Sequence, residues 1–190
     1  MRIAHCALLP DMASRSELLS LLTAYEPSDP DEQGYRIRML DLAAVAHDPF
    51  RRTDYDPGHF TASGFVVHPD GDRLLLIHHA RLGIWVQPGG HVDPADPSLL
   101  EAARREIIEE TGIARLHPVA DALVDIDIHR FGPSGDQPEH LHFDLRFAFV
   151  ADGADLNPNS EVLEAVWVTH EELHGLGANR SVLRPAGKLL

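Results

Sequence analysis

The stretch "QPGGHVDPADPSLLEAARREIIEETGI", residues 87–113, decides the fold of this chain. A double glycine at residues 89–90 leads into a short loop rich in Asp and Pro, and a segment with helical spacing follows. Asp96 or Ser98 suits the N-terminal cap of this helix, and Gly112 suits its C-terminal cap. The stretch therefore predicts a glycine turn followed directly by a helix.

Three glutamates share one face of that predicted helix. At about 100° of rotation per residue, Glu106, Glu109 and Glu110 fit within an arc of about 100°. Like charges at this spacing repel by about 0.2–0.5 kcal/mol per pair, and the helix dipole disfavours anions near the C-terminus. A solvated helix surface is the plain interpretation. A divalent cation would turn the repulsion into coordination, because Mg²⁺ takes carboxylates together with water and substrate phosphates.

The residues around the glutamates resemble the signature of the Nudix hydrolase family. That signature reads Gly, five residues, Glu, seven residues, then Arg-Glu-apolar-any-Glu-Glu-any-Gly-apolar. Gly90 matches its opening glycine, and a weaker resemblance extends over residues 60–175. The second half is matched at every fixed position by Arg105, Glu106, Ile107, Glu109, Glu110, Gly112 and Ile113.

Two departures from the signature fall in the loop. Asp96 stands where the family has Glu, and eight residues instead of seven separate it from Arg105. In the family this acidic residue braces the loop against the Arg of the motif. The resemblance implies that Asp96, or Asp93, does so here.

The resemblance implies a metal-dependent hydrolase that cleaves a nucleoside diphosphate linked to another group. Glu106 and Glu110 are then expected to be direct ligands of Mg²⁺ or Mn²⁺. Glu109 is expected to be a ligand or to act through water, and the Gly89 carbonyl is a further ligand. Arg105 is expected to orient the glutamates. The substrate is expected to be a small nucleotide-type molecule, whose negative charge the metal ions offset.

For the general base and for the substrate contacts, the sequence offers several candidates. Glu109 is the first choice for the base, and the alternatives are Glu161 and Glu164, ahead of the last strand, and Asp144. The candidates for substrate contact are Arg81, His91, His142, Asp144 and Glu161.

One predicted strand carries a polar face rich in histidine. His140, His142 and Asp144 alternate with apolar residues there, and His129 on a neighbouring strand could join them. A partly exposed polar sheet face is the plain interpretation. Substrate contact and a second metal site are the alternatives, since imidazole suits Zn²⁺, Ni²⁺ or Mn²⁺ better than Mg²⁺.

The bulk composition is that of a globular protein. The chain has 190 residues, 44% hydrophobic and 24% charged, and a formal net charge of −14. This charge argues against a nucleic-acid-binding surface, which needs a basic patch. Cys6 is the single cysteine, so no intramolecular disulfide is possible. The N-terminus is too interrupted for a signal peptide and no segment has the length of a membrane helix, so we expect a cytoplasmic protein.

The elements follow a mixed α/β order. We expect an N-terminal helical extension over residues 1–58, packed on a Nudix domain over residues 59–190. The domain is expected to be a Nudix-like α/β/α sandwich with a mixed sheet, because strands precede and follow the central helix. The extension could cover the site, form the interface of a homodimer or pad the sheet.

Two further classes compete with the enzyme. A non-hydrolytic Nudix-fold module would bind or sense a nucleotide, but such members usually lose motif glutamates, and all three remain here. An isomerase on the same fold would need a catalytic cysteine, and Cys6 lies far outside the motif. No sequence feature favours a purely structural role.

Overall fold

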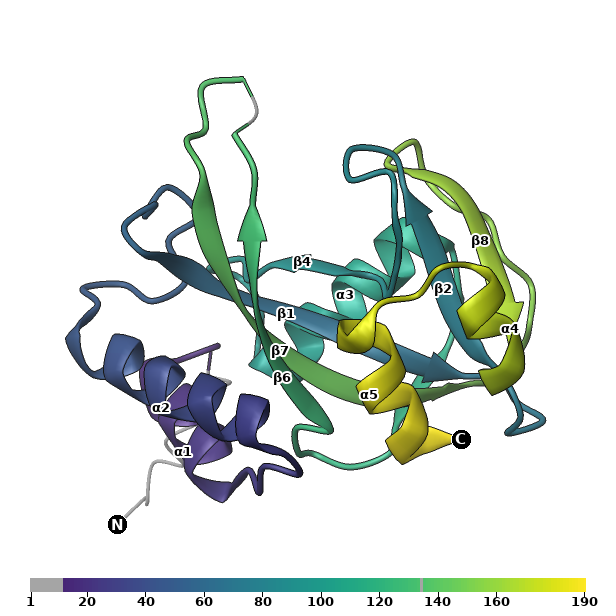
Figure 1. Cartoon of the computed structure of the whole chain (residues 1–190), viewed down its shortest axis with the longest axis horizontal. Coiled ribbons are helices and arrows are strands. Elements are labelled where there is room, and N and C mark those ends of the chain that lie inside the picture. Colours follow the sequence, from purple (N-terminus) through teal and green to yellow (C-terminus); the bar gives the residue numbers. More distant parts are fainter. Residues whose placement is uncertain (1–11, 134) are drawn as a thin grey trace, which may run out of the picture.

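The computed structural model describes residues 12–133 and 135–190, so Cys6 lies outside the described part. Figure 1 shows the arrangement of its helices and strands. The helices are α1 (Arg15–Ala24), α2 (Pro30–Val45), α3 (Leu99–Thr111), α4 (His170–Gly175) and α5 (Arg180–Leu189). The strands are β1 (Gly58–Val67), β2 (Leu74–His79), β3 (Trp85–Val86), β4 (Gly89–His91), β5 (Leu116–Pro118), β6 (Asp125–Phe131), β7 (His140–Ala151) and β8 (Val162–Val168).

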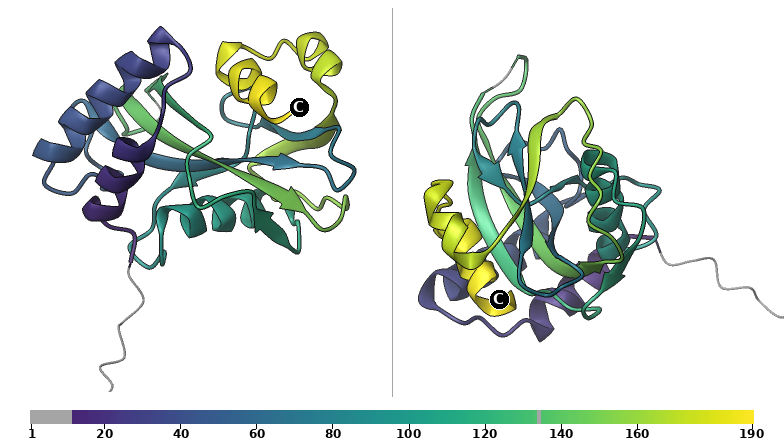
Figure 2. Two further views of the ribbon diagram at one scale, coloured as in Figure 1. Left: turned by 90° about the horizontal axis from the view of Figure 1, so that it is seen from below. Right: turned by 90° about the vertical axis from the view of Figure 1, so that its right-hand side faces the viewer.

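All eight strands belong to one mixed sheet. Its main path runs β3-β2-β1-β7-β5, while β4 pairs with β1, β6 with β7 and β8 with β2. The central pair β1–β7 is parallel, and the other pairs are antiparallel. Helix α3 covers one side of the curled sheet, and α5 lies on the other (Figure 2). The predicted α/β class with a mixed sheet between helices is therefore confirmed.

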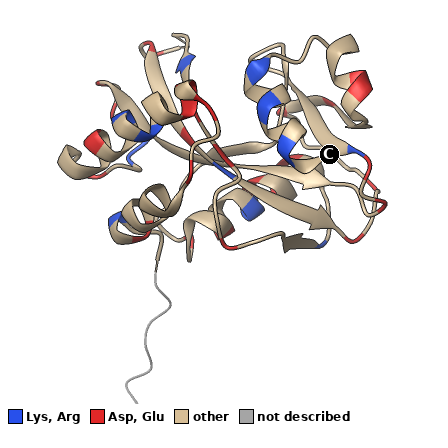
Figure 3. Cartoon of the chain, turned by 60° about the horizontal axis from the view of Figure 1, so that its bottom comes forward, with Lys and Arg blue, Asp and Glu red and all other residues tan. Residues whose placement is uncertain are grey.

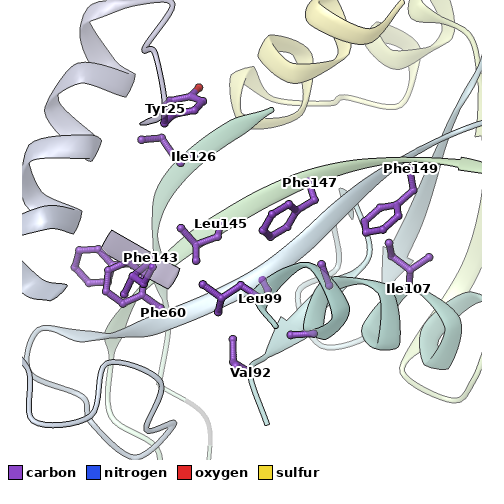
Figure 4. Packing of buried hydrophobic residues seen from close by; sticks show 14 of the residues in the cluster. Tyr25, Phe60, Val92, Leu99, Ile107, Ile126, Phe143, Leu145, Phe147 and Phe149 are labelled. Carbon is purple, nitrogen blue, oxygen red and sulfur yellow. The ribbon is translucent and has the colours of Figure 1, made fainter. Parts of the chain in front are cut away.

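The main core lies between the sheet and α3. Alternate residues of β7 point into it, and Figure 4 shows Leu145, Phe147 and Phe149 along the strand with Ile107 of α3 facing them. The N-terminal helices contribute to the same core through buried leucine, methionine and alanine side chains: Leu18, Leu22, Met39 and Ala43. The extension thus shares its core with the rest of the chain. A boundary at residue 58 stays a prediction.

The other face of β7 is polar and buried. Arg146 is only 2% exposed and forms ion pairs with Asp125, Asp127 and Asp144. Helix α5 covers this region: Arg184 and Lys188 pair with Asp125 of β6, and basic positions recur along the helix (Figure 3). His140, His142 and Asp144 are buried as well, so the expectation of a partly exposed polar face is wrong; the contacts of α5 lie at the Arg146 end of this face.

Several local predictions are refined by tertiary contacts. The neighbouring strand that carries His129 is β6, which pairs antiparallel with β7. Residues 89–91, expected to be a turn, form the short strand β4 against β1, and the segment 116–118 is a strand that the sequence did not indicate. Glu164 lies inside β8 and pairs with His78, not ahead of the strand. Short pieces like β4 and β5 depend on a neighbouring strand for their hydrogen bonds, so they lack a local signal.

Candidate active site

Helix α3 is positioned by its caps and by a glycine beneath it. The Ser98 hydroxyl accepts a hydrogen bond from the Glu101 N–H, and Gly112 ends the helix with a φ of 71°. A Cβ at Gly64 of β1 would lie 2.5 Å from Ile107 Cδ1, so this glycine lets the helix sit close to the sheet. The cap at Ser98 leaves the Asp96 side chain for another role.

Two of the three glutamates converge on the double glycine. A Cβ at Gly90 would lie 2.7 Å from the Glu106 carboxyl carbon, so only glycine permits this approach. The N–H of Gly89 donates a 2.8 Å hydrogen bond to Glu110 Oε2. A Cβ at Gly89 would collide with Ser63 of β1. Sheet and helix together therefore bring two carboxylates against adjacent backbone residues.

Burial changes the protonation of these two side chains. Burial, together with the charges of Glu106, Glu161 and Glu109 and against the Gly89 hydrogen bond, raises the pKa of Glu110 to about 8. Burial also raises the pKa of Glu106, whereas Arg105 lowers it. Burial and neighbouring negative charges make the ionised form of a carboxylate unfavourable. A bound cation relieves this penalty, so such a carboxylate favours cation binding.

Arg105 is the hub that connects these groups. Its Nη1 donates to Glu106 Oε1 at 2.9 Å and to Glu109 Oε2 at 3.2 Å, and its Nη2 donates to the carbonyl of His91 at 2.9 Å. Its Nε and Nη2 also donate to both oxygens of Asp96, at 2.9 and 3.0 Å. One guanidinium thus joins the helix, the loop and β4.

Asp96 braces the loop despite the extra residue. Its carboxylate, 4% exposed, also accepts the N–H of Asp93 at 2.7 Å, whereas the Asp93 carboxylate stays 4.0 Å from Arg105. The expectation that an acidic residue pairs with the motif Arg is therefore confirmed, with Asp96 in that role. The N–H of Asp96 donates to the Asp93 carbonyl at 2.9 Å, so the loop turns tightly just before the Asp96 side chain meets Arg105.

The N-terminal segment holds this loop from outside. The N–H of Ala13 donates to the carbonyl of Asp96 at 2.9 Å. Glu17 of α1 accepts the N–H of Leu99 at 2.9 Å, at the first turn of α3. The N–H of Glu17 also donates to the Ser14 hydroxyl that caps α1, at 3.2 Å, so Glu17 takes part in the start of both helices. The extension thus stabilises the loop and the start of α3.

The three glutamates do not form a closed ligand cluster. In the described residues, the groups with three ligand atoms within 4.8 Å of one another are His59, His91 and His142, and His68, Asp70 and Asp72. Glu109 is 55% exposed and is drawn towards Arg105, while Glu110 is drawn towards Gly89. The oxygen donors nevertheless suit a hard divalent cation in type and charge.

Two of the predicted substrate contacts lie in loops near the sheet edge. Glu161 precedes β8, and its negative charge raises the pKa of Glu110, which places it near the end of α3. Arg81 lies in the link between β2 and β3, where it stacks over Phe131 at 4.4 Å and donates to Gln137 Oε1 at 3.0 Å.

Asp144 is buried and fully engaged. Its two oxygens accept hydrogen bonds at 2.7–3.2 Å from Thr61, Ser63, Gln87 and Arg146. An acid that is 3% exposed and held by four donors anchors the strands around it, and its roles as general base and substrate contact stay predictions.

His91 and His142 meet on the sheet face that points away from α3. Gly90 is directed at Glu106 of α3, so its neighbour His91 points to the opposite side. There both rings lie beside His59 of β1, at centroid distances of 5.1 and 4.9 Å. The sequence did not single out His59, because its nearness depends on β1 pairing with both β4 and β7.

Among the residues that the structure describes, no helix has the length and apolar character needed to cross a bilayer.

Comparison with known proteins supports one family. The family model described as "NUDIX domain" matches residues 58–187. The phosphatase NudJ of Escherichia coli strain K12 is 34% identical over 114 residues, which cover 57% of this chain and 67% of NudJ. A NUDIX-family hydrolase from Clostridium perfringens has a TM-score of 0.52 at 24% identity, covering 69% of this chain and 95% of that one. The NUDIX domain of Shewanella oneidensis NrtR, solved with ADP ribose, has a TM-score of 0.51 at 13% identity, covering 89% of this chain and 94% of that domain.

The two structural likenesses show the fold. The domain match spans most of the chain and contains the turn, the loop and α3, and the identity with NudJ agrees with it. The resemblance carried by residues 90–113 is thereby confirmed. The chain belongs to the Nudix hydrolase family and is an enzyme of the pyrophosphohydrolase type.

Proposed function

We propose that this enzyme hydrolyses a phosphoanhydride bond in a nucleoside diphosphate derivative with the help of Mg²⁺ or Mn²⁺. The observation that carries the proposal is the convergence of Glu106 and Glu110 on the adjacent residues Gly89 and Gly90. The ionised form of both carboxylates is unfavourable in this position, because both lose hydration and repel each other. Cation binding is the role that accounts for the arrangement.

Each residue of the site has a proposed part. Glu106 and Glu110 hold the cation, with Glu109 and the Gly89 carbonyl as further ligands. A bound divalent ion supplies the positive charge that neutralises phosphate oxygens and activates water. Arg105 positions Glu106 and Glu109 through its hydrogen bonds.

Glu109 is the proposed general base. It is the most exposed of the three glutamates, so it can reach a water molecule that approaches from solvent. Glu161 is the second choice, because it also lies near Glu110. Its position on a loop would let it approach once a substrate is bound.

A surface hollow beside the loop is a suitable place for part of the substrate. It has a volume of about 550 Å³, and its lining combines an aromatic ring, two guanidinium groups and the first residues of the loop: Phe50, Arg51, Arg52, Val92, Asp93 and Pro94. Aromatic and cationic groups side by side suit a base and a phosphate. The predicted contact with Arg81 lies elsewhere, between β2 and β3, and stays a prediction.

The test is a hydrolysis screen with matched variants. Nucleoside diphosphate derivatives, with ADP ribose among them, are incubated with Mg²⁺ or Mn²⁺, and release of the nucleotide product is measured. Glu106→Gln, Glu109→Gln and Glu110→Gln are each expected to lower turnover by about 100-fold or more. Glu101→Gln removes the same charge from the first turn of α3 and is expected to keep full activity. Equal activity in all four variants would contradict the proposal.

The alternative of a non-hydrolytic nucleotide-binding module gives a different result. Such a module would bind nucleotides in a calorimeter with no turnover in any variant. All three motif glutamates are present, and two of them converge on the glycine turn, which favours the enzyme. A cytoplasmic location and a homodimer stay predictions from the sequence.

A further inference from the structure

Five histidines cluster at one end of the polar sheet face. They come from four strands: His59 from β1, His91 from β4, His129 from β6, and His140 and His142 from β7. The ring of His142 lies 4.9 Å from His59 and 5.5 Å from His91, centroid to centroid. One ring nitrogen from each of these three residues lies within 4.8 Å of the other two. Strands far apart in sequence thus direct imidazoles to one point.

The tautomer of His59 leaves an acceptor without a partner. Its Nδ1 lies 3.0 Å from the carbonyl oxygen of Asp54, which can only accept, so Nδ1 carries the proton. The Nε2 atom therefore presents a lone pair, and it is buried without a hydrogen-bond partner among the described residues. The residue itself is 0% exposed. A buried acceptor without a partner is unfavourable by about 1–3 kcal/mol, so its retention calls for a ligand.

Neutral imidazole is the form that binds metals, and the lone pair on the buried Nε2 of His59 belongs to that form.

We propose that His59, His91 and His142 form a binding site for a divalent transition-metal ion of the Zn²⁺ class. Imidazole suits such ions and does not favour Mg²⁺. Zn–N bonds of about 2.0–2.1 Å in a tetrahedral site put the ligand nitrogens about 3.3 Å apart, which small ring movements can reach. The Asp54 carbonyl that fixes the His59 tautomer is the outer contact typical of metal-binding histidine.

His140 lies beside the three and fixes the tautomer of His142. Its Nδ1 lies 2.8 Å from the Pro138 carbonyl and carries the proton, so its Nε2 accepts the hydrogen bond from His142 Nε2 at 3.1 Å, and the lone pair of His142 lies on Nδ1. His91 is the partly exposed member of the site and provides the entry for an ion. A metal-binding role replaces the substrate contact predicted for His91 and His142.

This site is separate from the glutamates. It lies on the opposite side of β4, and a backbone contact links the two sites, in which Arg105 Nη2 donates to the His91 carbonyl. The proposal does not depend on hydrolysis. It is therefore tested by metal binding, with the carboxylate site saturated by Mg²⁺.

The experiment titrates Co²⁺ into the metal-free full chain in excess Mg²⁺ and follows the visible absorption of tetrahedral cobalt. One equivalent of Co²⁺ is expected to give these bands, and Zn²⁺ is expected to displace it. His59→Asn and His142→Asn are each expected to weaken Co²⁺ binding. The loss is expected to be at least roughly 10–100-fold, which is the effect of removing an outer contact alone. His117→Asn, at an exposed histidine, and Glu110→Gln, in the carboxylate site, serve as controls and are expected to keep the bands.

A second measurement on the unmodified chain covers the case in which a variant does not fold. Imidazole nitrogen NMR with and without Zn²⁺ is expected to shift the Nε2 signal of His59 and to leave that of His117 unchanged. Absent cobalt bands, bands that survive in both His variants, or bands lost only in Glu110→Gln would each overturn the proposal. An unshifted His59 signal would do the same.

Discussion

The substitution Asp96→Asn removes the negative charge of the side chain that holds the loop and keeps nearly the same shape. The Asp96 carboxylate receives two hydrogen bonds from Arg105, at 2.9 and 3.0 Å, and one from the Asp93 N–H at 2.7 Å. The amide of Asn has one oxygen and one NH₂ group in the same place. The NH₂ group must then face a donor, either the guanidinium or the backbone N–H.

The expected loss of stability is about 2–3 kcal/mol. Breaking a fully buried ion pair costs about 3–5 kcal/mol, and a hydrogen bond to a charged group contributes about 1.5–3 kcal/mol. Asp96 is 4% exposed, but Arg105 is 25% exposed and keeps Glu106, Glu109 and the His91 carbonyl. The lower part of the range therefore applies. Turnover is expected to fall about 10–100-fold, the usual effect of losing a group that orients a metal ligand.

Urea unfolding of the metal-free protein measures the first effect, and steady-state hydrolysis measures the second. Asp93→Asn is the matched control, because that carboxylate lies 4.0 Å from Arg105 and is 58% exposed, so a change within about 0.5 kcal/mol is expected. Asp96→Glu, which installs the usual family residue, is expected to destabilise by about 1–3 kcal/mol through overpacking of the loop. If Asp96→Asn and Asp93→Asn unfold alike, the reasoning about the brace is refuted.

Three further predictions concern other parts of the molecule. Arg146→Met leaves three buried aspartates without their shared partner and is expected to lower the unfolding free energy by about 3–5 kcal/mol, as measured in urea; a loss below about 1 kcal/mol would contradict it. Gly90→Ala places a methyl 2.7 Å from the Glu106 carboxyl carbon, so a crystal structure is expected to show Glu106 displaced and the assay to show weaker Mg²⁺ activation; an unmoved carboxylate would count against it. In the metal-free protein the pKa of Glu110 is raised from 4.5 to about 8, so its contribution to stability is full below about pH 4.5 and is lost as the pH rises through about 8. The midpoint temperature of thermal unfolding is expected to fall more steeply with rising pH for the wild type than for Glu110→Gln. Parallel profiles of the two proteins would refute this prediction.

The sequence alone determined the elements whose signals are local. The cap at Gly112, the spacing of the three glutamates and the alternation along residues 140–151 are repeated patterns within one segment. Such patterns report backbone geometry directly, because one helix or strand face follows from its period. The family signature lies in one such segment, so it was readable despite the extra loop residue.

Tertiary structure decided which side chains meet across segments. The pairing of β1 with β4 and β7 brings His59 to His91 and His142, and packing of α5 covers the part of the polar face around Arg146. Asp96 and Asp93 were equal candidates for the loop brace until the loop closed on Arg105. These contacts depend on strand pairing and helix docking between remote residues, which no local period encodes. The carboxylates of α3 could therefore be predicted from the sequence. The contact of Asp96 with Arg105 and the histidine cluster form only when the chain folds.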